Sequence, residues 1–367
     1  MVYLLSITLC LLLPLAGAFL AGNPLEQYLE FPPLTRYVGH AGFSMPVFLA
    51  GLAALFILVA FGCRLFSRGE KNPFPKLTQS FPWWGWTGVV LTAVSWFLAW
   101  TRFDWFASLQ PYTFTPLWIG YILVVSALTF RRSGSCLARR QPRRFILLFP
   151  VSTLFWWYFE YLNRFVQNWY YIGIEDFTPT GYVLHASICF ATVLPAVICT
   201  LELLTTMECL AGRLKTGRSI PVSESPGTGW MLLLVSAVAL TSLAMVPDYL
   251  FPFVWIAPLF VITGVQVISG RRSFLASLRE GKLQLILFSA LAALVCGFFW
   301  EMWNLKSLAH WQYSIPYVDR FHIFAMPILG YAGYLPFGLE CVVVANLVLD
   351  RQDLLLESFP ASGFEQA

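Results

Sequence analysis

Ten long apolar runs follow one another along the chain, and they restrict its fold more than any other feature. A membrane-spanning helix needs about 20 predominantly apolar residues, because the hydrocarbon layer is about 30 Å thick. Barrel strands are shorter and alternate in polarity, whereas these runs are continuous. We therefore expect an all-α polytopic membrane protein with about ten transmembrane helices. The runs fall near residues 3–22, 45–63, 85–100, 116–130, 145–160, 182–204, 230–246, 253–269, 283–300 and 322–349.

The charged residues support this expectation by their scarcity and their positions. Only 11% of the 367 residues are charged and 58% are hydrophobic, whereas soluble domains carry about 25% charged residues. The formal net charge of +4 could suggest an acidic partner. However, the basic residues lie in short loops between apolar runs, where they report topology instead. We therefore expect membrane lipid, and no nucleic acid, among the partners.

The same basic residues assign the two sides of the membrane. With a cytoplasmic amino terminus, 18 of the 23 lysine and arginine residues fall in inner loops, as the positive-inside rule requires. This predicts a multi-pass protein of a bacterial inner or plasma membrane with a cytoplasmic carboxyl terminus. The sequence Ala16-Gly17-Ala18 resembles a signal-peptide cleavage site, but nothing basic precedes the apolar core before it. We expect a retained first helix rather than a removed signal peptide.

Short segments recur 140 to 144 residues apart, which indicates an internal repeat. We expect two parallel four-helix units at about 83–210 and 227–350, because an even number of helices returns the chain to its starting side. An amino-terminal transmembrane pair in 1–80 precedes them and a short tail, 351–367, follows. The matching segments include Gly85-Trp86 with Gly229-Trp230, Arg131-Arg132-Ser133 with Arg271-Arg272-Ser273, and Leu194-Pro195 with Leu335-Pro336.

One recurring motif brings acidic and amide side chains to the outer ends of two helices. Its two copies are Glu-x-x-Asn sequences, each followed by a Trp-x-Tyr sequence, and Glu340 lies deep in the last apolar run. A carboxylate at membrane depth costs roughly 2.5 to 3.5 kcal/mol on insertion scales, so it should face protein or water. We therefore predict Glu160, Glu301 and Glu340 as catalytic residues. The predicted substrate-binding residues are Asn163, Asn304, Trp169, Tyr171, His310, Trp311, Tyr313 and His185.

Structural interpretations of the same residues stay open. Glu301 with Asn304 could form a hydrogen-bonded polar network that joins the two units. Tryptophan and tyrosine also form aromatic belts at membrane interfaces. Asp104 and Asp248 are expected to mark helix ends.

Other side chains give no sign of a metal or cofactor. His310 and His322 are 12 residues apart and lack a His-x-x-x-His spacing, so we expect no metal site. The eight cysteines form no Cys-x-x-Cys pair and are expected as buried free thiols. The chain contains no phosphate-binding glycine loop and no Gly-x-Ser-x-Gly sequence, so we expect no cofactor and no soluble hydrolase or kinase chemistry.

The third and fourth helices of each unit resemble the lycopene cyclase domain of small integral-membrane carotenoid cyclases, and less directly the related membrane carotenoid hydratases. The resemblance rests on the acidic residue near a helix end, the Trp-x-Tyr sequence and the Leu-Pro of the last helix. Where that family has glutamate directly after the proline, this chain has Ala196 and Phe337, and the nearest acids are Glu202 and Glu340.

The resemblance implies cofactor-independent acid-base chemistry on a lipophilic isoprenoid or lipid. In that reaction a proton is donated to a polyene double bond and a carbocation is then deprotonated. Glu301 and Glu340 would supply the acid and base, with Glu160 as the partner from the other unit, and aromatic faces such as that of Trp300 would stabilise the cation. The alternative is a non-enzymatic transporter or structural membrane subunit. The substrate and the oligomeric state are not specified by the sequence.

Overall fold

The computed structural model describes residues 2–33, 36–65, 78–207 and 217–349, and these residues are mostly helical. The long helices are α1 (Val2–Leu20), α3 (Met45–Leu65), α4 (Trp83–Trp100), α5 (Phe114–Ser133), α7 (Pro142–Val166), α8 (Pro179–Phe190), α9 (Val193–Thr205), α11 (Pro226–Ser242), α13 (Ala257–Ile268), α15 (Gln284–Asn304) and α16 (Tyr334–Leu349). The shorter helical segments are α2 (Glu26–Leu29), η1 (Asp104–Tyr112), α6 (Leu137–Arg140), α12 (Pro247–Leu250), η2 (Phe251–Trp255), α14 (Phe274–Arg279) and η3 (Ile328–Gly333).

Six described helical segments are long and apolar enough to cross a membrane. A seventh crossing would be the bent pair Pro247–Trp255 and Ala257–Ile268, whose parts meet at 53°. The remaining predicted runs coincide with helices α1, α4 and α11. The all-helical prediction is therefore confirmed, whereas ten crossings, the two-unit division and the sides of the membrane stay predictions. The six segments are Met45–Leu65, Phe114–Ser133, Pro142–Val166, Pro179–Thr205, Gln284–Asn304 and Ile328–Leu349.

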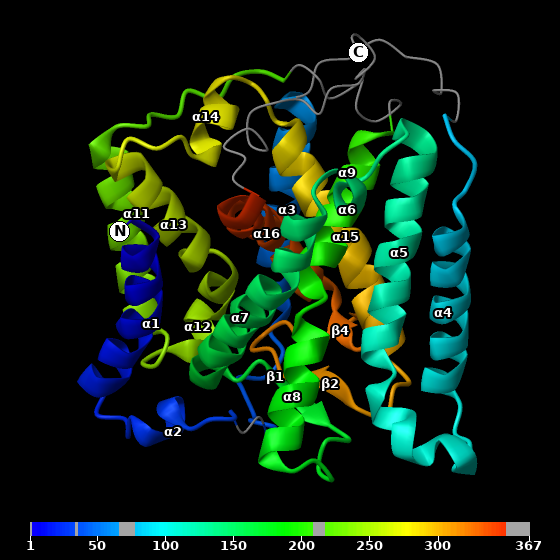
Figure 1. Ribbon diagram of the computed structural model, residues 1–367. Coiled ribbons are helices and arrows are strands. Elements are labelled where there is room, and N and C mark those ends of the chain that lie inside the picture. Colours follow the sequence, from blue (N-terminus) through cyan, green and yellow to red (C-terminus); the bar gives the residue numbers. More distant parts are fainter. Residues whose placement is uncertain (1, 34–35, 66–77, 208–216, 350–367) are drawn as a thin grey trace.

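A central group of helices is flanked by two outer groups. Helix α15 packs against α9 and α16, and α7 packs against α9. In Figure 1, α4 and α5 lie on the right of this centre, and α1, α11 and α13 lie on the left. Helix α14 lies at the upper end of the molecule, whereas β1 (Trp169–Ile172), β2 (His310–Tyr313) and α2 lie toward the lower end. The predicted tail 351–367 lies outside the described residues.

The outer helix pairs approach each other closely at glycines. A Cβ added to Gly120 of α5 would lie 2.9 Å from the carbonyl oxygen of Gly88 in α4. A Cβ added to Gly264 of α13 would lie 2.8 Å from the carbonyl oxygen of Gly229 in α11. Small residues let helix backbones approach each other closely within a membrane. Glycines have this role in both helix pairs.

The structure contains two short antiparallel strand pairs that the sequence did not predict. Strands β1 and β2 form a two-stranded antiparallel ribbon, and β3 (His322–Ile323) with β4 (Met326–Pro327) forms another. The seven described cysteines are free, and all except Cys63 are buried, as predicted. Cys209 lies outside the described residues. Asp104 begins η1 and Asp248 lies in the first turn of α12, so both mark helix ends as expected.

Candidate functional site

The two Trp-x-Tyr sequences, far apart in the chain, pair with each other in space. In the β1–β2 ribbon, Trp169 is opposite Tyr313 and Tyr171 is opposite Trp311. Each strand follows the end of a long helix, β1 after α7 and β2 after α15. The ribbon therefore joins the ends of the two helices that carry the Glu-x-x-Asn motifs.

The asparagines of the motifs hold these strands against the helix ends. The Asn163 carboxamide accepts a hydrogen bond from the Asn168 backbone N–H at 2.9 Å and donates to the Trp169 carbonyl at 2.8 Å. Asn304 accepts from the Trp311 N–H at 2.8 Å and donates to the Trp311 carbonyl at 2.7 Å. Buried backbone groups past a helix end need such partners. The two asparagines thus position the strands, and neither lines the cavity described below.

Glu160 of α7 is fully buried, and one of its carboxyl oxygens accepts three hydrogen bonds from aromatic side chains. Its Oε1 accepts from the Tyr171 hydroxyl at 2.6 Å, the Trp169 indole N–H at 3.0 Å and the Trp156 indole N–H at 3.1 Å. Among the described residues, its Oε2 has no hydrogen-bond partner. A buried carboxyl is stabilised only when such donors replace water.

Glu301 of α15 is also fully buried, but its donors are hydroxyls. Its Oε1 accepts from the Tyr313 hydroxyl at 2.6 Å and from the Tyr334 hydroxyl at 3.2 Å. The Trp311 indole donates to the Tyr313 hydroxyl at 2.8 Å and also interacts with the Glu301 carboxyl. In the described part of the chain, Oε2 of Glu301 lacks a partner, as Oε2 of Glu160 does.

A cavity of about 130 Å³ lies between these two arrangements. Its wall is mostly aromatic and apolar, and it contains the aromatic partners of both carboxyls, while Glu160 and Glu301 themselves lie one side chain behind it. Six of the predicted substrate-binding residues line it. They are Trp169, Tyr171, His185, His310, Trp311 and Tyr313, and the wall also includes Trp156, Trp255, Trp300, Tyr182, Tyr334, Phe114 and Phe190.

The ribbon tyrosines are protonated hydrogen-bond donors at neutral pH. Burial, and secondarily the neighbouring Glu160, raises the pKa of Tyr171 well above its usual value. Burial and Glu301 raise the pKa of Tyr313 in the same way. Both phenols contact the cavity and a buried carboxyl at once. One tyrosine therefore connects each glutamate with the cavity wall.

The structure does not bring Glu340 to this cavity. On α16, Tyr334 reaches the cavity and the Phe337 ring packs against Trp156 and Trp300. Glu340 follows one helical turn beyond Phe337 and lies within electrostatic range of Tyr158 instead. Both of its carboxyl oxygens are buried without a partner among the described residues. Glu340 does not line the cavity, and its predicted place in a site with Glu160 and Glu301 stays a prediction.

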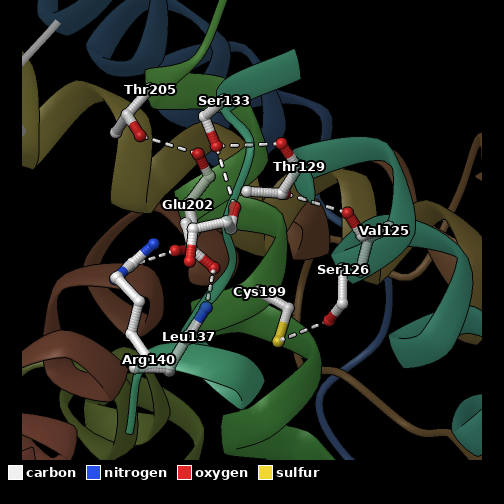
Figure 2. Close-up of polar contacts among 10 residues, drawn as sticks. Val125, Ser126, Thr129, Ser133, Leu137, Arg140, Cys199, Glu202 and Thr205 are labelled. Carbon is white, nitrogen blue, oxygen red and sulfur yellow. Dashed lines mark hydrogen bonds and ion pairs between the residues drawn. The ribbon is translucent and has the colours of Figure 1, made fainter. Parts of the chain in front are cut away.

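Glu202 of α9, the acid nearest to Leu194-Pro195, has a structural role. It accepts a hydrogen bond from the Leu137 backbone N–H at 2.9 Å and forms an ion pair with Arg140. Figure 2 shows how these contacts tie α6 to α9, beside the bonds from Ser126 to Cys199 and from Ser133 to Thr129. Glu202 therefore fixes the arginine-rich loop and does not line the aromatic cavity.

The predicted histidines have different surroundings. His185 stacks on Phe177, with ring centroids 5.2 Å apart, and contacts Tyr112 edge-on at 4.9 Å. His310 bonds the Leu308 carbonyl through Nδ1 at 2.9 Å. Both lie on the cavity wall. Within the described residues, no three His, Cys, Asp or Glu side chains lie close enough to bind a metal ion together.

Sequence reasoning missed three contributors. Trp156 and Tyr334 donate to the two carboxyls, although neither belongs to a recurring motif. His40 binds Asp248 at 2.7 Å and the Gln167 carbonyl at 3.2 Å, which ties the loop before α3 to the start of the ribbon. At the spacing of 141 residues that separates Glu160 from Glu301, Gly297 corresponds to Trp156, so this donor carries no repeat signal.

Comparison with known proteins gives no family: no family model, no curated protein and no solved structure matches this chain.

Proposed function

We propose that this chain is a multi-pass membrane enzyme that performs cofactor-independent acid-base chemistry on a lipophilic isoprenoid or lipid. One observation carries the proposal. Tyr171 and Tyr313 line one aromatic cavity, and the hydroxyl of each lies 2.6 Å from a fully buried glutamate carboxyl. General acid-base catalysis needs a proton donor and acceptor held within hydrogen-bond reach of the reacting group.

The reaction that suits this arrangement is an isomerisation or cyclisation of a carbon–carbon double bond. The π electron pair of the substrate takes a proton from a tyrosine hydroxyl, whose oxygen is reprotonated by its glutamate. The adjacent carbon then carries a positive charge, which the faces of the cavity tryptophans stabilise. Loss of a neighbouring C–H proton returns its electron pair to the substrate as a new double bond. One proton is consumed and one released, and no electrons are transferred to another molecule.

The volume of the cavity indicates that only the reacting end of a long lipophilic substrate would lie inside it. Its volume is about 130 Å³, and a protein cavity of roughly 150 Å³ is large enough to bind benzene. A group of five or six carbons therefore fits, while a longer apolar chain would extend outside. Leu184 and Ile188 of α8 are exposed and apolar, beside the cavity residues His185 and Cys189. A lipid chain leaving the cavity there would find an apolar surface.

Deuterium incorporation tests the proposal even while the substrate is unidentified. The purified protein, reconstituted with a lipid extract in D₂O, should introduce deuterium at carbon into a lipophilic compound, detected by mass spectrometry. The variants Tyr171→Phe and Tyr313→Phe, which remove the hydroxyls and keep the rings, should reduce the incorporation. Absence of carbon-bound deuterium with extracts rich in isoprenoids would favour a non-enzymatic membrane subunit.

Expression in a cell that accumulates linear carotenoids sharpens the substrate class. Pigment chromatography should show a new product with the unmodified chain and not with Tyr313→Phe. An unchanged pigment profile, together with deuterium incorporation into another lipid, would reject the carotenoid and keep the chemistry.

A further inference from the structure

We infer that the two buried carboxyls have unequal roles: Glu301 exchanges the proton, and Glu160 remains a fixed anion beside the cavity. This inference rests on the proposed function for its chemical purpose, but the protonation states it assigns are measurable without any substrate. It follows from the kind of donor around each carboxyl, from two residue exchanges between the halves, and from one nearby charge.

The donors around Glu160 favour its carboxylate form over its protonated form. An indole N–H can only donate a hydrogen bond, whereas a phenol hydroxyl can donate or accept. Trp156 and Trp169 both donate to Glu160, at 3.1 and 3.0 Å. A protonated carboxyl is a poorer acceptor than a carboxylate, so two obligate donors together with the Tyr171 hydroxyl favour the anion.

The donors around Glu301 allow both states. Tyr313 and Tyr334 contact it through hydroxyls, at 2.6 and 3.2 Å. The Trp311 indole also interacts with it, but this indole makes its 2.8 Å hydrogen bond to the Tyr313 hydroxyl. When Glu301 carries a proton, its O–H can donate to one of these hydroxyls, whose own hydrogen is then free to point into the cavity that both tyrosines line. Reversal of a single hydrogen bond thus turns a proton stored on Glu301 into one presented to the guest.

A pair of residue exchanges produces this difference. Glu160 and Glu301 are 141 residues apart, and at the same spacing Trp156 corresponds to Gly297 and Val193 to Tyr334. A Cβ at Gly297 would collide with the Tyr334 ring. One half therefore places an indole beside the carboxyl from its own helix. In the other half a glycine leaves space for a phenol from the following helix.

The nearby charge differs in the same direction. Arg164 lies one turn beyond Glu160 on α7, and its guanidinium is held there by a hydrogen bond to the Tyr28 carbonyl at 2.6 Å. At the spacing of 141 residues, the equivalent of Arg164 is Leu305. Among the described residues, Tyr182 also lies within electrostatic range of Glu160, and Tyr331 lies within electrostatic range of Glu301.

Infrared spectroscopy of matched glutamine variants tests the assignment. Glu301→Gln should remove the carbonyl stretch of a protonated carboxylic acid whose intensity falls as the pH rises. Glu160→Gln should remove a carboxylate stretch and no protonated-acid band. Glu340→Gln identifies the separate band of the unpartnered acid. A protonated-acid band that disappears in Glu160→Gln, or a Glu301→Gln spectrum that loses only carboxylate absorption, would overturn the inference.

A second variant keeps the test valid if a glutamine variant does not fold. Trp156→Phe removes one obligate donor and keeps an aromatic ring, so Glu160 should gain a protonated-acid band at low pH. If no such band appears and near-ultraviolet circular dichroism shows intact packing, the inference is contradicted. Deuterium incorporation with indistinguishable carboxyl spectra would reject the unequal roles alone. Unequal spectra without incorporation would instead reject the proposed function.

Discussion

The Glu160 and Glu301 sites begin from the same motif and differ in the partners that reach their carboxyls. In both, an asparagine three residues later holds a Trp-x-Tyr strand, and a tyrosine hydroxyl lies 2.6 Å from the carboxyl. Around Glu160 two indoles donate at 3.0 and 3.1 Å. Around Glu301 the additional close donor is a second hydroxyl, and the Trp311 indole donates at 2.8 Å to the Tyr313 hydroxyl instead. The shared motif therefore determines where the acids lie, and a few unshared residues determine what each acid can do.

The largest expected effect separates the two tyrosines of the ribbon. Tyr313→Phe interrupts the path from the proton-exchanging Glu301, so deuterium incorporation should fall roughly 100-fold, which is typical for loss of a general acid. Tyr171→Phe leaves Glu160 its two indole donors, so we expect a smaller loss of about tenfold. Mass spectrometry under equal enzyme and lipid concentrations measures both. Equal losses would remove the functional difference between the two sites.

The next largest effect concerns the asparagines and appears in stability. Asn163→Ala and Asn304→Ala each leave buried backbone groups unpaired, and each should lower the free energy of unfolding by about 2 kcal/mol or more. Asn163 should cost more, because its oxygen also lies 3.4 Å from the Trp169 N–H. Denaturant unfolding in detergent measures the loss, with the exposed Thr87→Ala as control. Losses no larger than that of the control would mean that the asparagines do not hold the ribbon.

A smaller effect follows from exchanging the charge beside the carboxyls. Arg164→Leu gives the Glu160 site the residue found four positions after Glu301, and we expect its carboxylate infrared band to diminish at acidic pH. Leu305→Arg should strengthen the carboxylate band of Glu301 at acidic pH. It should also reduce deuterium incorporation several-fold, because a carboxylate has no proton to donate. Spectra that do not respond to either exchange would show that the ring donors alone control the two sites.

The smallest expected effect is the alkaline loss of stability from the two buried phenols. The folded-state pKa values of Tyr171 and Tyr313 are raised above the unfolded value of about 10. Their contribution is therefore complete below that pH and is lost as the pH rises above it. Unfolding measurements at neutral and alkaline pH should show a smaller alkaline loss in the Tyr171→Phe, Tyr313→Phe double variant. An unchanged loss would place both phenols in contact with water.

The helical character followed from the sequence because it depends on local features. Continuous apolar runs predict helices, and a carboxyl such as Glu160 within such a run must find polar partners. Six predicted residues do line one cavity. The antiparallel pairing of Trp169 with Tyr313 was not predicted, since the two strands are separated by more than a hundred residues and each is only four residues long.

The surroundings of Glu340 were also outside the reach of sequence pattern. The residue is 1% exposed, yet it does not line the cavity. A pattern of apolar residues could not show that Phe337, one turn earlier, packs against the cavity rings Trp156 and Trp300. Tyr334 was missed for the opposite reason, because its position has valine as its counterpart and so carries no repeat signal.

An experimental structure of the protein in lipid, with a lipophilic guest, tests the central claim most directly. The account predicts density for an apolar group between the two ribbon tyrosines, in contact with the hydroxyls of both Tyr171 and Tyr313 and with the buried carboxyls directly behind them. A cavity closed by side chains, or a guest that contacts neither hydroxyl, would contradict it.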